Sequence, residues 1–180
     1  MHDIALIALF AGCLVPASIA AYIDFRRLLL PNFIVLPVWI AGLVWALYSG
    51  HIQDAVLGMI LGFVPGFIGF QLGGLGGGDV KLMAALGTWF GVLVVPIILV
   101  GCCLGFLWSL IRLARAGQLK AWARDFGRSL FMRYVLKVRD AMVVPSLSDS
   151  PTPGFGNVLP FGPSLVIAAW TIFLFAKGGF

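Results

Sequence analysis

The sequence has few acidic residues. Its 180 residues include only seven carboxylates, all of them aspartate, and charged residues make up 11% of the chain while hydrophobic residues make up 61%. Soluble domains carry roughly 25% charged residues. The composition therefore excludes an ordinary soluble domain and predicts an integral membrane protein.

Cysteine is scarce as well. Cys13, Cys102 and Cys103 all lie in apolar runs, where a thiol behaves as a small hydrophobic group, and no CxxC pair occurs. A disulfide framework or a zinc site built from cysteines is therefore not expected.

Long hydrophobic runs, by contrast, are abundant. A membrane-spanning helix needs about 20 mainly apolar residues, and the candidates are residues 4–23, 33–48, 55–72, 80–111 and 159–176. As one helix, residues 80–111 would measure about 48 Å, too long for a hydrocarbon core of ~30 Å. We therefore expect a hairpin that turns near residues 88–91. The predicted fold class is an all-α membrane protein of six transmembrane helices, with a short fourth helix and a cytoplasmic amphipathic segment.

The basic residues predict the orientation. With six spans and the N-terminus outside, eleven of the twelve Lys and Arg residues face the cytoplasm and only Lys177 lies outside. A five-span chain would instead leave the eight basic residues between positions 112 and 139 outside. The six-span arrangement places loops 24–32 and 73–81 on the cytoplasmic side, and with them Asp24 and Asp79.

The same orientation places other polar residues outside. Asp3 and Asp54 are expected to be plain loop or helix-end charges. His2 and His51 also fall on the outer side, so neither can serve a cytoplasmic serine, cysteine or metal site. We expect no metal and no organic cofactor.

Three segments are predicted: a membrane domain over residues 1–111, a basic cytoplasmic segment with a linker over 112–158, and a last transmembrane helix over 159–180. Within the second, apolar residues and basic residues each recur at helical spacing, the pattern of a helix on an anionic lipid surface. A solvated face that only sets topology would show the same charges. Nothing points to a nucleic-acid partner. The residues of the two stripes are Leu119, Trp122, Phe126 and Leu130, and Lys120, Arg124 and Arg128.

Asp79 follows a glycine-rich run, GGLGGG, at residues 73–78. Glycines allow backbone and a partner helix to approach a carboxylate closely. A nucleotide-binding loop does not fit, because an aspartate stands where the third glycine is required and no GK[ST] follows. The alternative is a glycine-rich turn with a helix-capping aspartate before Val80.

Asp24 closes the first predicted span and precedes Arg26 and Arg27. Alone, it could be a helix-end charge paired with either arginine. A carboxylate beside hydrocarbon costs about 2.5 kcal/mol or more, so two at the same membrane face suggest one shared site. Two close carboxylates cannot both ionise cheaply, and such a pair can hold one shared proton for acid/base chemistry on a peptide bond.

The strings DFRRLLLPN at 24–32, GGGDVK at 76–81 and LPFGP at 159–163 resemble the type IV prepilin peptidases, the GxGD-type aspartic proteases of the inner membrane. The resemblance implies cleavage of prepilin or pseudopilin leaders, with Asp24 and Asp79 catalytic. It implies an active-site setting of Gly76, Gly77, Gly78, Lys81, Arg26, Arg27, Pro31 and Asn32.

Longer, bifunctional members of that family carry two CxxC pairs in a cytoplasmic domain near the first aspartate and also methylate the product. Here only about eight residues separate Asp24 from the second predicted span, so methyl transfer is not expected. The chain is more similar to the short peptidases that serve Flp-type pili. Which aspartate is the base and which oligomer forms stay open.

Two rival functions also fit a polytopic membrane protein with buried aspartates. A proton-coupled transporter would place them near the membrane midplane on broken helices. A structural subunit of a secretion or pilus machine would need no aspartate pair.

Overall fold

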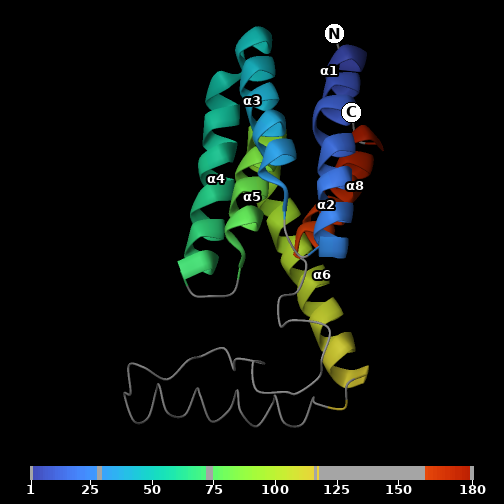
Figure 1. Ribbon diagram of the computed structural model, residues 1–180. Coiled ribbons are helices and arrows are strands. Elements are labelled where there is room, and N and C mark those ends of the chain that lie inside the picture. The colour runs from blue at the N-terminus through green and yellow to red at the C-terminus, as the bar shows by residue number, and fades with distance from the viewer. Residues whose placement is uncertain (1, 28–29, 72–74, 116, 118–160, 179–180) are drawn as a thin grey trace. The chain divides into compact units, whose positions relative to one another are not determined.

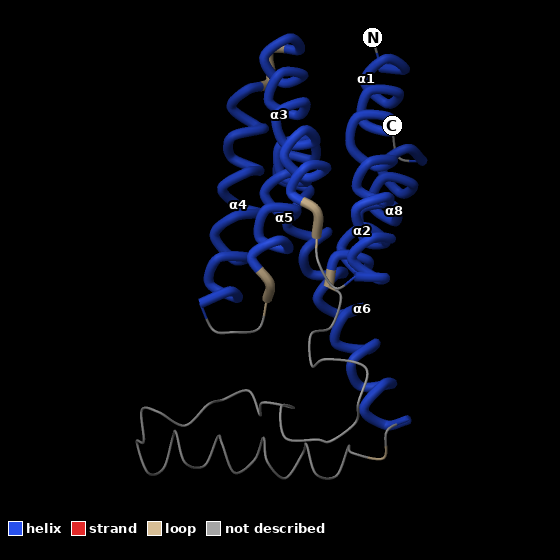
Figure 2. The backbone as a smooth tube through the Cα atoms, in the orientation of Figure 1, coloured by secondary structure: helices blue, strands red, loops and turns tan. Residues whose placement is uncertain are grey.

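The computed structural model describes residues 2–27, 30–71, 75–115, 117 and 161–178, and within these ranges it is helical, without strands (Figures 1 and 2). The described residues form seven α-helices, one π-helical turn (η1) and one 3₁₀ turn (η2). They are α1 (His2–Leu9), η1 (Phe10–Leu14), α2 (Val15–Arg27), α3 (Asn32–Ser49), α4 (Ile52–Gln71), α5 (Gly77–Phe90), η2 (Gly91–Leu93), α6 (Val94–Arg115) and α8 (Gly162–Gly178).

Four apolar helical stretches in the described residues are long enough to span a membrane: Ile4–Arg27, Asn32–Ser49, Ile52–Gln71 and Gly77–Arg112, the last of which contains the turn at Gly91–Leu93. A shorter apolar helix covers Gly162–Phe175. The prediction of an all-helical chain with several candidate spans is therefore confirmed. The count of six spans stays a prediction.

Two helix boundaries differ from the expected ones in ways that matter for the site. The first helix continues past residue 23 to Arg27, so Asp24 lies inside its last turn. Helix α5 begins at Gly77, so Asp79 is its third residue rather than a cap before Val80. A run of glycine and one aspartate gives no apolar signal, which is why the apolar pattern alone places the start too late.

The long apolar stretch after Asp79 breaks at Gly91, at the end of the region where a turn is expected. Gly91 has φ +55° and ψ −132°, a conformation that a side chain makes costly. Its backbone lies beside Asp54 at the start of α4, whereas Gly105 of α6 lies beside Phe161 at the start of α8. Helix α6 therefore runs back from the turn at Gly91 (Figure 1).

Helix α5 is the most enclosed element of the described chain. From Asp79 to Phe90, only Lys81 is exposed and only Trp89 is half-buried. Helix α4 packs along it more extensively than any other pair of elements, because glycines face α5 on every turn: Gly58 lies against Gly87, and Gly62 against the Met83 carbonyl. Small residues allow helix backbones to approach this closely.

The chain divides into two compact units, Met1–Gly105 with Pro160–Phe180, and Phe106–Leu159. Both aspartates of interest belong to the first unit. Of the second, only residues 106–115 and 117 are described. The predicted amphipathic helix around Trp122 and the predicted linker at 146–156 lie outside the described residues.

Candidate active site

Asp24 continues a stripe of small buried residues on α2. Ala17, Ala20 and Ala21 face the protein interior, and Asp24 follows at the same helical spacing with 5% of its surface exposed. The Asp24 carboxyl group therefore points into the protein interior. An ionisable group inside a membrane protein is a candidate functional residue.

Helix α8 supplies the partner of Asp24. The two helices pack together, and Trp170 Nε1 donates a hydrogen bond to Ser18 Oγ at 3.0 Å, which fixes their register. At the first residue of α8, the Gly162 backbone N–H donates to Asp24 Oδ2 at 3.3 Å. An unpaired N–H at a helix N-terminus favours a negative charge beside it.

Asp79 is equally enclosed, with 7% of its surface exposed. Its Oδ2 accepts the Gly76 backbone N–H at 3.2 Å, as a helix-capping side chain does. Its Oδ1, however, is buried without a hydrogen-bond partner among the described residues. The capping alternative thus accounts for one carboxyl oxygen and leaves the other free for a different role, since a buried polar atom without a partner is costly.

The fold brings the two carboxyl groups together. One side chain links their surroundings: Leu30 lies against Gly78, which precedes Asp79, and against Gly162, which donates to Asp24. The ends of α2, α5 and α8 therefore meet around the pair.

Lys81 and Asn32 meet at the same end of the unit. Lys81 Nζ donates a hydrogen bond to Asn32 Oδ1 at 3.1 Å across 49 positions of sequence. Asn32 is the first residue of α3 and follows Pro31, whose carbonyl accepts the first backbone bonds of that helix. The bond ties the start of α3 to the first turns of α5.

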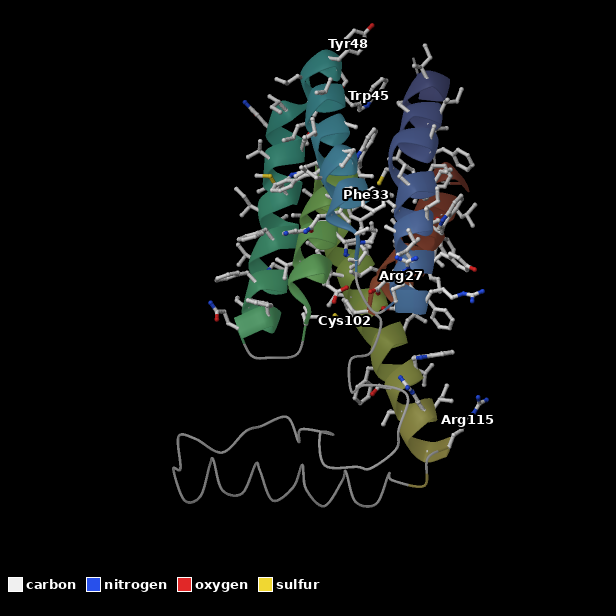
Figure 3. The ribbon with its side chains drawn as sticks, viewed as in Figure 1. Arg27, Phe33, Trp45, Tyr48, Cys102 and Arg115 are labelled. Atoms are coloured by element: carbon white, nitrogen blue, oxygen red, sulfur yellow. The ribbon has the colours of Figure 1, made fainter. Side chains whose placement is uncertain are left out.

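Arg26 and Arg27 are not part of this cluster. Both are exposed, the Arg26 guanidinium lies over the Tyr22 ring at 5.4 Å, and no ion pair joins either arginine to Asp24 in the described chain. Figure 3 shows Arg27 at the end of α2. The alternative in which Asp24 is a helix-end charge paired with an arginine is therefore not seen.

Histidine and metal chemistry have no support in the part of the chain that the structure describes. No group of three metal-ligating side chains occurs there. His51 contacts Asp54 at 3.7 Å, at the opposite end of α4 from the glycine run, about 30 Å away along a helix at ~1.5 Å per residue. What remains is a pair of enclosed carboxyl groups, which can divide the work of a base and an acid.

Gly162 and Leu30 are the two neighbours of the pair that were not expected as site residues. Gly162 belongs to the LPFGP string at the start of the last helix, which is one of the strings that carry the family resemblance, so the sequence could have indicated it as a site residue. Leu30 stands among three consecutive leucines, and nothing in its sequence context distinguishes it.

The fold and the site are those of a helical membrane protein with two enclosed aspartates at helix ends, and sequence comparison identifies its family. The chain belongs to the type IV leader peptidase family, which it matches over residues 5–110. The resemblance to prepilin peptidases is thus confirmed. No solved structure matches the chain significantly.

Several curated relatives are similar along most of this chain. A prepilin leader peptidase/N-methyltransferase of Xanthomonas campestris pv. campestris is 30% identical over 165 residues, 86% of this chain and 45% of that protein. One of Neisseria gonorrhoeae is 29% identical over 84% of this chain and 43% of that protein. The type 4 prepilin-like proteins leader peptide-processing enzyme of Escherichia coli O78:H11 is 36% identical over 51% of this chain and 38% of that protein. The chain spans less than half the length of these relatives.

Proposed function

We propose that this protein is a membrane aspartic endopeptidase that removes the leader peptide of a prepilin or pseudopilin. The observation that carries the proposal is the convergence of Asp24 and Asp79, which lie 55 positions apart in the sequence, around Leu30 and Gly162 in a chain of the type IV leader peptidase family. Burying two acidic groups at one location is costly, and ionisable residues inside a membrane protein mark functional sites.

The reaction needs one carboxylate and one carboxylic acid. The ionised member takes a proton from water, and the resulting hydroxide adds to the carbonyl carbon of the scissile peptide while the protonated member donates to the carbonyl oxygen. In the breakdown of the tetrahedral intermediate, the carboxyl group that took the proton from water gives it to the leaving amine as the C–N bond breaks. The other carboxylate recovers a proton from a hydroxyl of the intermediate, so the pair returns to its starting state. The free Oδ1 of Asp79 is suited to the water or the carbonyl oxygen. Because coupled carboxyl groups titrate as a pair, the site needs no fixed assignment of base and acid at rest.

The proposal includes a location. The chain would lie in the inner membrane with six spans, in contact with lipid, and its active site would face the cytoplasm. The positive-inside distribution of Lys and Arg supports this orientation, as do Arg26 and Arg27 at the same helix end as Asp24. The basic segment at 112–139 would then lie on the cytoplasmic surface.

The proposal also includes a subtype. Helices α2 and α3 are joined by residues 28–31 alone, so no second catalytic domain is inserted between Asp24 and α3. We therefore expect cleavage without methylation of the new N-terminus, as in the peptidases of Flp-type pili.

A transporter function finds less support. Asp24 lies in the last turn of α2 and Asp79 in the first turn of α5, so both lie at the ends of candidate membrane spans. A transporter site near the membrane midplane would instead place them at breaks in the middle of a span.

Co-expression with a cognate prepilin, in a host without its own prepilin peptidase, tests the function. The wild-type chain should convert the prepilin to a faster-migrating product whose mass equals the mature, unmethylated pilin. Asp24→Asn and Asp79→Asn should each abolish conversion, because an amide keeps the size of the side chain but cannot exchange a proton.

Asp54→Asn is the matched control, since Asp54 is 70% exposed at the far end of α4. It should process prepilin like the wild type. All four proteins must accumulate in the membrane to similar levels. Retention of more than about a tenth of wild-type processing by either Asn variant at the pair would rule out the two-carboxylate mechanism, since loss of an essential acid or base costs far more.

A further inference from the structure

Leu30 has a location that no catalytic motif explains. A β-carbon placed on Gly78 would lie 2.7 Å from Leu30 Cβ and 3.4 Å from Leu30 Cδ1, and one placed on Gly162 would lie 3.5 Å from the same Cδ1. The leucine side chain therefore fills the space that these two glycines leave open, with Asp79 on one side and the partner of Asp24 on the other.

We propose that Leu30 is the positioning residue that sets the spacing between the Asp24 and Asp79 carboxyl groups. The inference rests on the proposed peptidase function. Gly162 holds Asp24 through its N–H, and Gly78 precedes Asp79 in the first turn of α5. The Leu30 side chain lies between those two backbone segments, and its volume fixes the distance between the two carboxyl groups. It touches neither a reacting atom nor the substrate in this role.

The bond between Lys81 and Asn32 holds Leu30 in place. Asn32 lies two residues after Leu30, and Lys81 lies two residues after Asp79. Their hydrogen bond of 3.1 Å therefore clamps the segment that carries Leu30 onto the helix that carries Asp79. Pro31, between Leu30 and Asn32, restricts the backbone of this short segment further.

This arrangement explains two exposed residues that acid/base chemistry does not use. Lys81 and Asn32 are both exposed, so their bond contributes little to stability in water. Holding a catalytic pair within a fraction of an ångström requires support of this kind, because a displacement of 1 Å can cost about 100-fold in rate.

The test compares Leu30→Ala with Leu30→Ile and with Leu61→Ala, in purified full-length protein acting on purified cognate prepilin. Leu61 is the matched control: it is half-buried on α4 and packs against the same core. Leu30→Ala should lower kcat by about 10- to 100-fold with little change in KM. Leu30→Ile should restore most of the rate. Leu61→Ala should lower the melting temperature comparably and keep kcat.

The pH profile separates positioning from simple stability. Without the Leu30 side chain between them, the two carboxyl groups can approach and interact more strongly, which separates their two pKa values further. The bell of kcat against pH should therefore broaden in Leu30→Ala and keep its width in Leu61→Ala. Unchanged kcat and an unchanged profile in a folded Leu30→Ala protein would overturn the proposal.

If Leu30→Ala does not accumulate, a second pair of variants tests whether the Lys81–Asn32 bond holds the Leu30 segment in position. Lys81→Gln and Asn32→Ala should each lower kcat, and the double variant should be no slower than the slower single one, because both remove one bond. A wild-type kcat in Lys81→Gln, or losses of kcat that add fully in the double variant, would overturn the proposal that this bond positions Leu30. Absence of cleavage by the wild-type protein would instead refute the peptidase function itself.

Discussion

Gly77 and Gly78 are neighbours in one glycine run, but the structure gives them different surroundings. A β-carbon on Gly78 would meet Leu30 Cβ at 2.7 Å, whereas one on Gly77 would meet only the Phe70 ring, at 3.7 Å. The first distance is a collision with an atom next to the backbone. The second is an ordinary contact. Of these two positions, only position 78 therefore requires glycine, although the sequence alone does not distinguish them.

We predict that Gly78→Ala lowers prepilin cleavage by about 100-fold, because Leu30 or the first turn of α5 must move and carry Asp79 with it. Gly77→Ala should stay within about twofold of the wild type, as substitutions without a collision do. Initial rates on purified prepilin, measured at equal amounts of folded protein, check the contrast. Equal losses in both variants would mean that the glycine run acts as a flexible loop.

The sequence alone singles out the two aspartates as candidate site residues, but it does not single out the residues that contact them. Asp24 and Asp79 are conspicuous because a carboxylate in an apolar stretch has an energetic cost that needs a reason. Leu30 and Gly162 are unremarkable as residue types, and their roles depend on contacts between segments that are far apart in the sequence. The resemblance includes Arg26 and Arg27 in the site, but both are exposed. Arg26, two positions from Asp24, lies on another face of the helix and over the Tyr22 ring, and Arg27 is the last residue of α2.

At the scale of helices, the pairing of α4 with α5 determines where Asp79 stands. Glycines recur at Gly58, Gly62 and Gly66, every fourth residue of α4, and each faces α5. The sequence predicts both helices from their apolar composition, and the turn near Gly91 from the excess length. The glycine spacing marks one face of α4 for close helix packing, but it does not identify α5 as the helix that packs there.

We predict a graded response along this glycine series. At Gly62 a β-carbon would collide with the Met83 carbonyl, which belongs to the backbone of α5, while at Gly66 it would lie 3.1 Å from Met83 Sδ. A methionine side chain can move aside and a helix backbone cannot. Gly62→Ala should therefore destabilise the protein by about 1–3 kcal/mol.

Gly66→Ala is the control within the same helix and should have a clearly smaller effect. Thermal unfolding of the two purified variants in one detergent, followed by tryptophan fluorescence, gives the comparison. A larger loss of stability for Gly66→Ala than for Gly62→Ala would show that α4 and α5 do not pack in the observed register.

At the scale of the whole molecule, the active-site proposal depends on both aspartates facing one side of the membrane. Within the first unit, Asp24, the start of α3, the start of α5 and the start of α8 are joined by side-chain contacts. Trp45 and Tyr48, whose rings lie 6.0 Å apart, occupy the other end of α3 (Figure 3). Aromatic residues favour the membrane interface, which supports the proposal that the two ends of α3 lie at opposite faces of a bilayer.

We predict that the end with the aspartates is cytoplasmic, because eleven of the twelve Lys and Arg residues then lie inside. Reporter fusions after residues 52 and 92 should report the outside, and a fusion after residue 130 should report the inside. The fusion after residue 92 tests the turn at Gly91, and the one after residue 130 tests the basic segment. An outside signal at 130 with an inside signal at 92 would mean that the chain does not turn back at Gly91. The start of α8 would then lie on the opposite side of the membrane from Asp24, which the hydrogen bond from Gly162 to Asp24 excludes.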